Sequence, residues 1–201
     1  MELRYNLKNK ELSPISILLG FEVVKNAEDI EFLFNTYVNG VFGKVETKSR
    51  EFETILNIGE LYDNLESLLN NLKLDEELAI ASLIKKDGEI YHIPLIDFFE
   101  SESQKVYDSM ERLQEKFNYD VYLFQSGRSY HGYMDASLST SDWLDFLSAL
   151  LLLNNQDNYI IDARWVAHSM RQRFSSLRIS CNTPAYIAYP ISWQKIPKRR
   201  H

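Results

Sequence analysis

The N-terminal third of the chain contains three apolar segments that differ in their spacing. Residues 15–24 are apolar and rich in β-branched side chains, which favours a strand. In the next segment the apolar residues recur at intervals of three and four, which is typical of an amphipathic helix; they are Ile30, Leu33, Phe34, Tyr37, Val38 and Val41. The same helical spacing recurs in Leu61, Leu65, Leu68, Leu69 and Leu72. The pattern therefore predicts a strand followed by two helices.

The middle of the chain predicts a β-hairpin, a helix and a further strand. Residues 78–84 and 90–98 are apolar, and the turn-forming sequence Lys-Asp-Gly at 86–88 separates them. Residues 103–117 place their apolar side chains on one face of a helix. Residues 121–124 form a short apolar run that we interpret as a strand.

The C-terminal third begins with a helix-start signal. Ser139 and Asp142 form a Ser-x-x-Asp sequence, a variant of the capping box. The helix behind it carries an apolar stripe that we assign to the core: Trp143, Phe146, Leu147, Leu150 and Leu151. A short strand is predicted at 159–161, a helix at 163–173 and a last strand at 177–180. Helices alternate with strands and two strands form a hairpin, so the expected fold is α+β or mixed α/β with a largely antiparallel sheet.

Composition limits the class of protein. The chain has 201 residues, of which 45% are hydrophobic and 25% charged, as in an ordinary globular protein. Its formal net charge of -7 excludes the broad basic surface of a sequence-independent DNA-binding protein. Any nucleic-acid contact is therefore expected in a small basic cleft, and basic residues do gather between Arg164 and Arg200. The one cysteine, Cys181, excludes an intrachain disulfide and a zinc–thiolate cluster.

No targeting or membrane segment is visible. The first residues lack the apolar stretch of a signal peptide, and the leucine run at 150–153 is far too short to span a bilayer. We therefore expect a cytoplasmic protein with no membrane partner.

The segment 126–133, Ser-Gly-Arg-Ser-Tyr-His-Gly-Tyr, combines glycines with side chains that bind phosphate. Glycine lets a backbone approach a ligand closely. Arg128, Ser129 and His131 are of the residue types that donate hydrogen bonds to phosphate oxygens. Because the segment follows a predicted strand, we interpret it as a glycine-flanked loop that holds an anionic ligand.

Two acids also lie at predicted strand ends. Asp97 comes near the end of the 90–98 strand and Asp162 follows the 159–161 strand. A carboxylate at the end of a buried strand is costly unless it is paired, hydrogen-bonded or bound to a metal. Structural roles are open too: Asp162 suits the N-cap of the helix behind it, Asp97 could cap a helix or end a strand, and His131 could be a hydrogen-bonded loop residue.

Taken in order, these elements resemble the motifs of the archaeo-eukaryotic primase (AEP) superfamily. That family shows an acidic hhhDhD/E motif, then sxH, then hD with a basic residue downstream. The matching residues here are Leu95-Ile96-Asp97, Ser129-Tyr130-His131, and Ile161-Asp162 with Arg178. The resemblance covers roughly residues 78–190 and is greatest to small primase-like proteins of bacteria and mobile elements.

The resemblance implies an α+β fold with an AEP-like catalytic core. Its RRM-like, largely antiparallel sheet would pack with helices, beside an N-terminal α/β unit. Residues 77–201 would form the core and residues 1–76 the N-terminal unit, within one compact structure. The implied function is a primase- or polymerase-like nucleotidyltransferase that uses nucleoside triphosphates, a DNA or RNA template, and a helicase or other protein partner.

The resemblance also assigns roles to residues. Asp97 and Asp162 would bind Mg²⁺ or Mn²⁺ and, with His131, make up the catalytic set. Ser129, Arg128, His131 and Arg178 would contact the nucleotide phosphates.

One position departs from the family pattern. Phe99 stands where the second acid of the first motif is expected, and phenylalanine cannot bind a metal. Glu100 is the nearest acid, but in a regular strand it points away from Asp97; a bulge would be required to bring it into the metal site. The alternative function is therefore a catalytically degraded AEP-fold module that binds nucleotides or nucleic-acid ends in a larger assembly, such as a mobile-element or defence system.

Overall fold

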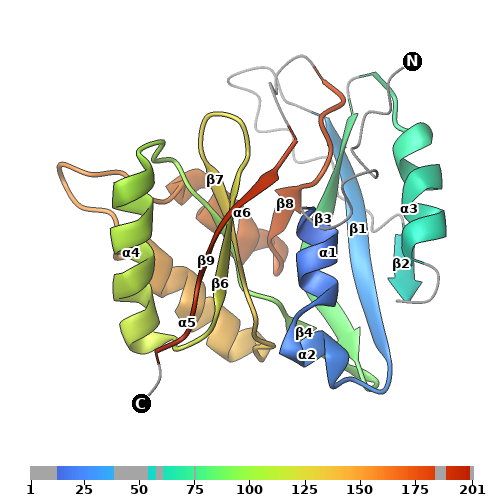
Figure 1. Ribbon diagram of the computed structural model, residues 1–201, viewed down its shortest axis with the longest axis horizontal. Coiled ribbons are helices and arrows are strands. Elements are labelled where there is room, and N and C mark those ends of the chain that lie inside the picture. Colours follow the sequence, from blue (N-terminus) through green and yellow to red (C-terminus); the bar gives the residue numbers. More distant parts are fainter. Residues whose placement is uncertain (1–12, 39–53, 58–60, 75, 184–188, 200–201) are drawn as a thin grey trace.

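The computed structural model describes residues 13–38, 54–57, 61–74, 76–183 and 189–199. They form two antiparallel sheets that stand side by side, with helices packed against both (Figure 1). The large sheet contains β2 (Thr54–Asn57), β1 (Ile30–Val38), β3 (Glu76–Lys86) and β4 (Glu89–His92), and β8 (Ser176–Arg178) also pairs with β3. The small sheet contains, in spatial order, β5 (Leu95–Asp97), β7 (Tyr130–Met134), β6 (Val121–Gln125) and β9 (Ile191–Ile196).

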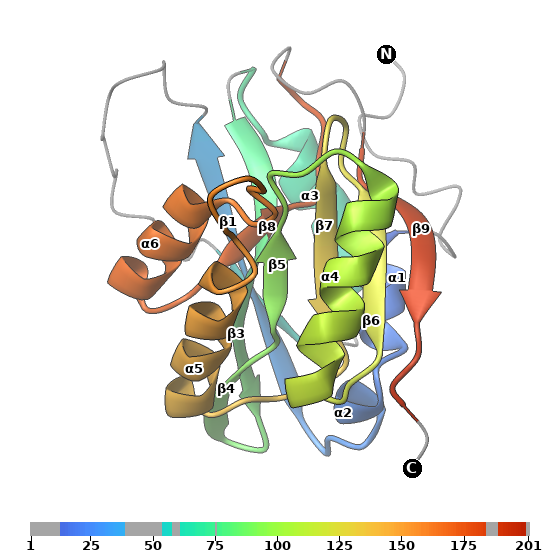
Figure 2. The ribbon, with the colours of Figure 1, turned by 90° about the vertical axis from the view of Figure 1, so that its left-hand side faces the viewer.

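Helices cover the sheets on opposite sides of the molecule. Figure 2 shows α4 and α5 lying along the small sheet, with α6 above α5. The helix bounds are α1 (Pro14–Leu19), α2 (Glu22–Lys25), α3 (Leu61–Asn70), α4 (Ser103–Lys116), α5 (Thr140–Leu151) and α6 (Ala163–Gln172). An α+β architecture with antiparallel sheets is therefore confirmed.

One core joins the two sheets. It contains side chains of α1, α3, β1 and β3, and also Leu95, Phe124 and Tyr133 of the small sheet. A second core fills the space between the small sheet and the helices α4 and α5. The shared core fixes the position of β8 beside β5, and these two strands carry Arg178 and Asp97. Strands from both sides of residue 76 share the large sheet, and the division into units at that residue stays a prediction.

Two N-terminal predictions were wrong. Residues 15–24 form the helices α1 and α2, because Ser13 caps the first turn through its side chain and Pro14 occupies the first helical position. The segment from Ile30 forms strand β1, which is buried on both faces, so its apolar residues do not alternate and imitate a helical spacing. The end of that predicted helix, at Val41, lies outside the described residues.

The other predicted elements are present with small differences, except that the strand predicted at 159–161 is reduced to an isolated bridge between Ile161 and Phe98. The hairpin is β3–β4, but the predicted 90–98 strand divides at Ile93 and Pro94 into β4 of the large sheet and β5 of the small sheet. Ser139 caps α5 as predicted and accepts a hydrogen bond from the Asp142 N–H at 3.2 Å. The 126–133 segment was predicted to be a loop, but only 126–129 form the turn; the next five residues are strand β7, whose extended backbone pairs with β5 and β6.

Gly132 permits close packing at the centre of the small sheet. It lies opposite Ile96 of β5, and a Cβ at Gly132 would meet the Ile96 Cβ and Cδ1 atoms at 3.2 Å and the Phe98 Cε2 atom at 3.3 Å. Glycine at this position therefore fills a packing role and keeps β7 against β5, next to His131.

We expect Gly132→Ala to lower the free energy of unfolding by about 1–3 kcal/mol, because the added methyl group overpacks this contact. Urea denaturation of Gly132→Ala, Ile96→Val and the double variant measures the effect. Ile96→Val removes one contacting methyl, so the double variant should lose less stability than the sum of the two single variants. Additive losses would contradict this packing explanation.

Candidate active site

His131, Asp97 and Asp162 form one cross-strand row. Asp97 of β5 is paired in register with His131 of β7. On its other side the Asp162 N–H donates to the Asp97 carbonyl at 3.1 Å, next to an isolated bridge between Phe98 and Ile161. Residues directly opposite in antiparallel strands project to the same face. The two motif aspartates and the motif histidine are thus brought together on one face of the small sheet.

Asn154 holds the segment that carries Asp162. Its Oδ1 accepts the N–H groups of Ile160 and Ile161 at 2.8 Å each, and its Nδ2 donates to the Ile161 carbonyl at 3.0 Å. These three bonds hold the backbone of residues 160–161, which pairs with β5 and its extension through an isolated bridge. Nothing in the sequence singles out this positioning residue, because an asparagine in a polar connection is ordinary turn chemistry.

Asp162 is also the N-cap of α6. Its Oδ1 accepts the N–H groups of Arg164 at 2.9 Å and Trp165 at 3.2 Å. The capping role considered from the sequence is therefore confirmed. Capping fixes the carboxylate at the helix start, where it still faces Asp97 closely enough to raise the pKa of that group.

Arg178 connects the large sheet to the β6–β7 turn. It is 4% exposed, and its guanidinium donates to the Ser126 carbonyl at 3.0 Å and to the Ser180 carbonyl. Its positive charge opposes the rise in the pKa of Asp97 and adds to the lowering of the pKa of His131. The fourth residue of the motif set therefore lies at the same site, although it comes from the other sheet.

The site has unusual proton affinities. Burial, and secondly the charge of Asp162, raises the pKa of Asp97 to about 8. Burial, and secondly the charge of Arg178, lowers the pKa of His131 to about 3. The His131 Nε2 and Asp97 Oδ1 atoms are 3.7 Å apart, which is too long for a hydrogen bond. Because His131 is neutral above pH 3, this contact is not an ion pair at neutral pH.

One ring nitrogen of His131 is available for a hydrogen bond to a ligand. The side chain is buried, yet its Nδ1 atom has no hydrogen-bond partner among the described residues. A buried polar atom without a partner costs free energy, and such atoms concentrate at ligand sites. A neutral imidazole can donate to a phosphate oxygen or accept from a ligand hydroxyl.

The β6–β7 turn carries the remaining predicted phosphate ligands. The Ser126 N–H donates to the Ser129 carbonyl at 2.9 Å, and Gly127 has a φ of 99°, which favours glycine. Arg128 is exposed at the turn, and Ser129 is half-buried two residues before His131. Both residues lie in the turn that leads into β7, and their role in binding stays a prediction.

The Glu100 carboxylate contacts the start of α4 and makes no contact with the two aspartates among the interactions described. Its Oε1 accepts the N–H groups of Ser101 at 2.8 Å and Glu102 at 2.9 Å, and its Oε2 lies 3.5 Å from the Lys105 Nζ atom. The Glu102 N–H is the leading cause that lowers the pKa of Glu100. These contacts place the carboxylate at the start of α4, and a role as metal ligand would require it to leave them.

The residues present fit one divalent cation bound together with phosphate. Asp97 and Asp162 face each other, and their mutual repulsion would be relieved by a cation between them. Mg²⁺ commonly uses one or two carboxylates together with substrate phosphates. Among the described residues no group of three or more His, Cys, Asp or Glu side chains could hold a metal by itself. Two carboxylates are a donor set of the kind that Mg²⁺ uses when it also binds a phosphate ligand.

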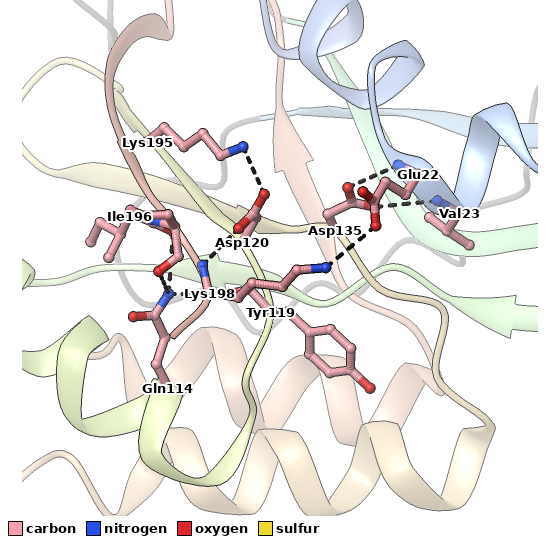
Figure 3. A network of polar contacts seen from close by, with 10 residues as sticks. Glu22, Val23, Gln114, Tyr119, Asp120, Asp135, Lys195, Ile196 and Lys198 are labelled. Atoms are coloured by element: carbon pink, nitrogen blue, oxygen red, sulfur yellow. Dashed lines mark hydrogen bonds and ion pairs between the residues drawn. The ribbon is translucent and has the colours of Figure 1, made fainter. Parts of the chain in front are cut away.

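A cavity of about 340 Å³ lies at the other end of the β6–β7 hairpin. Figure 3 shows the polar network around it, where Asp120 bonds to Lys195 and Asp135 accepts the N–H groups of Glu22 and Val23. Asp120 precedes β6 and Asp135 follows β7, whereas His131 is close to the turn. This network ties α2 to the small sheet and is separate from the row of motif residues.

Comparison with known proteins identifies the family. The family model described as archaeo-eukaryotic primase 1D-like matches residues 59–191, which is more than half of the chain. The chain therefore belongs to this AEP-like family, and the resemblance seen in its three motifs is confirmed. No curated protein and no solved structure matches it significantly. None of the described helices has the length and hydrophobicity that crossing a membrane requires.

We expect Asp97→Asn to stabilise the metal-free protein increasingly as the pH rises from 4 to 8. The folded protein keeps Asp97 protonated up to about pH 8, whereas the unfolded chain ionises it near its ordinary value of 3.8, so folding becomes costlier across that window. Denaturant unfolding with EDTA at pH 5 and pH 8 measures the difference. Asp157→Asn, at an exposed loop position, is the matched control and should show no such trend. An equal effect of Asp97→Asn at both pH values would contradict the raised pKa.

Proposed function

We propose that the protein is a primase- or polymerase-like nucleotidyltransferase that binds a nucleoside triphosphate at the Asp97–His131–Asp162 row. The observation that carries the proposal is the geometry of this row, since three motifs distant in sequence meet on one face of the small sheet. Membership of an AEP-like family supports the class of reaction. The unpartnered His131 Nδ1 and the guanidinium of Arg178 supply groups of the kind that bind phosphate.

Asp97 and Asp162 would hold Mg²⁺ or Mn²⁺. The bound cation would neutralise charge on the triphosphate and orient it for attack by a primer hydroxyl. The two carboxylates would fix the cation, and His131 would orient a phosphate oxygen from the neighbouring strand. Arg178 holds the β6–β7 turn in place, so that Ser129 and Arg128 are presented next to the phosphates.

Helix α6 offers the local basic surface that a template strand requires. It begins at Asp162 and carries the exposed residues Arg164 and Arg171, and the exposed Arg173 ends it. Because the whole chain is acidic, this short basic surface at the start and end of one helix is where we place contact with a nucleic-acid backbone.

The second candidate function is a nucleotide-binding module without catalysis. Phe99 favours it, because it stands at the second-acid position and leaves two carboxylates in the row. A polymerase that positions two metals normally has more oxygen ligands than this. The module would hold a nucleotide or a nucleic-acid end for a protein partner.

Incorporation of labelled nucleotides on a primed template with Mn²⁺ separates the two candidates. For an enzyme we expect Asp97→Asn and Asp162→Asn each to lower incorporation by at least a hundredfold, because each removes a metal ligand. Asp157→Asn should leave it unchanged. For a binding module, the unmutated protein shows no incorporation on DNA or RNA templates, yet nucleotide binding is saturable and survives Asp97→Asn.

We also expect Phe99→Asp to increase Mn²⁺ affinity roughly tenfold or more, because it places a second carboxylate two residues from Asp97 on the same face of the strand. Isothermal titration with MnCl₂ alone measures this. Phe99→Asn is the matched control, since it has the same shape without the charge. If Phe99→Asp binds Mn²⁺ no better than Phe99→Asn, this position does not face the metal site.

A further inference from the structure

Along β5 and the two residues that follow it, every second side chain is more exposed than the one before. Leu95 is 1% exposed in the shared core, the Asp97 side chain is 27% exposed, and Phe99 is 67% exposed. The intervening residues Ile96 and Phe98 are buried in the other core. Side chains two apart in a strand share a face, so Leu95, Asp97 and Phe99 lie in one line that runs from the core through the acid to solvent.

The backbone holds Phe99 in this line. The Phe98 N–H donates to the Tyr130 carbonyl at 3.1 Å on one side, and the Phe99 N–H donates to the Ile160 carbonyl at 2.9 Å on the other. The Glu100 N–H donates to the same Ile160 carbonyl at 3.2 Å, so the regular pairing ends at Phe99. Phe99 is therefore the last residue of this extension whose backbone the pairing holds next to Asp97.

The Phe99 ring takes no part in the core. It belongs to none of the buried clusters or their packed neighbours among the described residues. A large apolar side chain exposed beside a polar site is a common sign of a contact with a ligand or a partner. Tyr159, which precedes the paired residue Ile160, is a second exposed aromatic residue and is 62% exposed.

The chemistry of an exposed ring next to a phosphate site favours a nucleobase as its occupant. Two residues of strand separate Phe99 from Asp97 by roughly 7 Å. The base of a nucleotide is joined to its phosphates through one sugar, which is a comparable length. An aromatic ring stacks on any base, because every base has a π face.

We propose that Phe99 is the stacking platform for the base of the nucleotide whose phosphates are held at Asp97, His131 and Arg178. The inference rests on the proposed function, because it takes the phosphate position from it. In this proposal, Phe99 binds the base at the position where the family pattern has a metal-binding acid.

The experiment compares a nucleoside triphosphate with inorganic tripolyphosphate, which has the phosphates without a base. Affinities for both are measured with Mn²⁺ for the unmutated protein, Phe99→Leu, Phe99→Ala and Phe99→Trp. We expect Phe99→Leu and Phe99→Ala to weaken nucleotide binding by about 5- to 100-fold, the usual range for loss of one stacked base, and to leave tripolyphosphate binding unchanged. Phe99→Trp should retain nucleotide affinity, and its added fluorescence should be quenched by the nucleotide but not by tripolyphosphate.

Leu152→Ala is the matched control, because Leu152 is 84% exposed at the end of α5 and lies outside the row. It should change neither affinity, and thermal melts should show that all variants fold. Equal nucleotide affinity in the unmutated protein and Phe99→Ala would overturn the inference while the proposed function stands. If the unmutated protein binds neither ligand, the proposed function fails and the inference fails with it. If Phe99→Ala weakens both ligands equally, Phe99 acts on the phosphate site and the stacking role is wrong.

Discussion

The structure depends on the pairing of residues 95–99 with a neighbour on each side. Strand β7 pairs on one side and the short 160–162 segment on the other, so that Asp97 lies between His131 and Asp162. Backbone hydrogen bonds fix the register, and register decides which side chains share a face. A shift of one residue would turn Asp97 into the apolar core and would place Ile96 or Phe98 at the site. The burial of those two side chains is therefore what holds the acid in position.

This arrangement brings the ionisable groups of Asp97, Asp162, His131 and Arg178 together at a site with little access to solvent. Burial, and secondly the charge of Asp162, disfavours the ionised form of Asp97, whereas the charge of Arg178 favours it. Burial, and secondly the charge of Arg178, keeps His131 neutral. A cation bound between the two carboxylates would favour their ionised forms. The perturbed pKa values of the row are therefore consistent with a site that binds a cation together with nucleotide phosphates.

Much of the secondary structure could be predicted from local signals. The caps at Ser139 and Asp162 and the Asp-Gly turn at 87–88 are short-range chemistry, and the elements that they bound are present. Prediction failed at β1 because a strand buried on both faces has no alternation to detect. It failed at α1 because the β-branched residues favoured a strand, although Ser13 and Pro14 begin a helix. The division of the 90–98 run at Pro94 depends on which sheet each half joins, and that is a tertiary matter.

The sequence by itself determined the residue types of the site and their order, and these were enough to identify the family that the family model confirms. Only the tertiary structure decided which residues meet. It brings His131, Asp97 and Asp162 into one row and lets Arg178 contact the β6–β7 turn. It also places the Glu100 carboxylate at the start of α4 and leaves Phe99 exposed. The physical reason is that residue chemistry is local, whereas register, burial and the shared core arise from contacts between segments far apart in the chain.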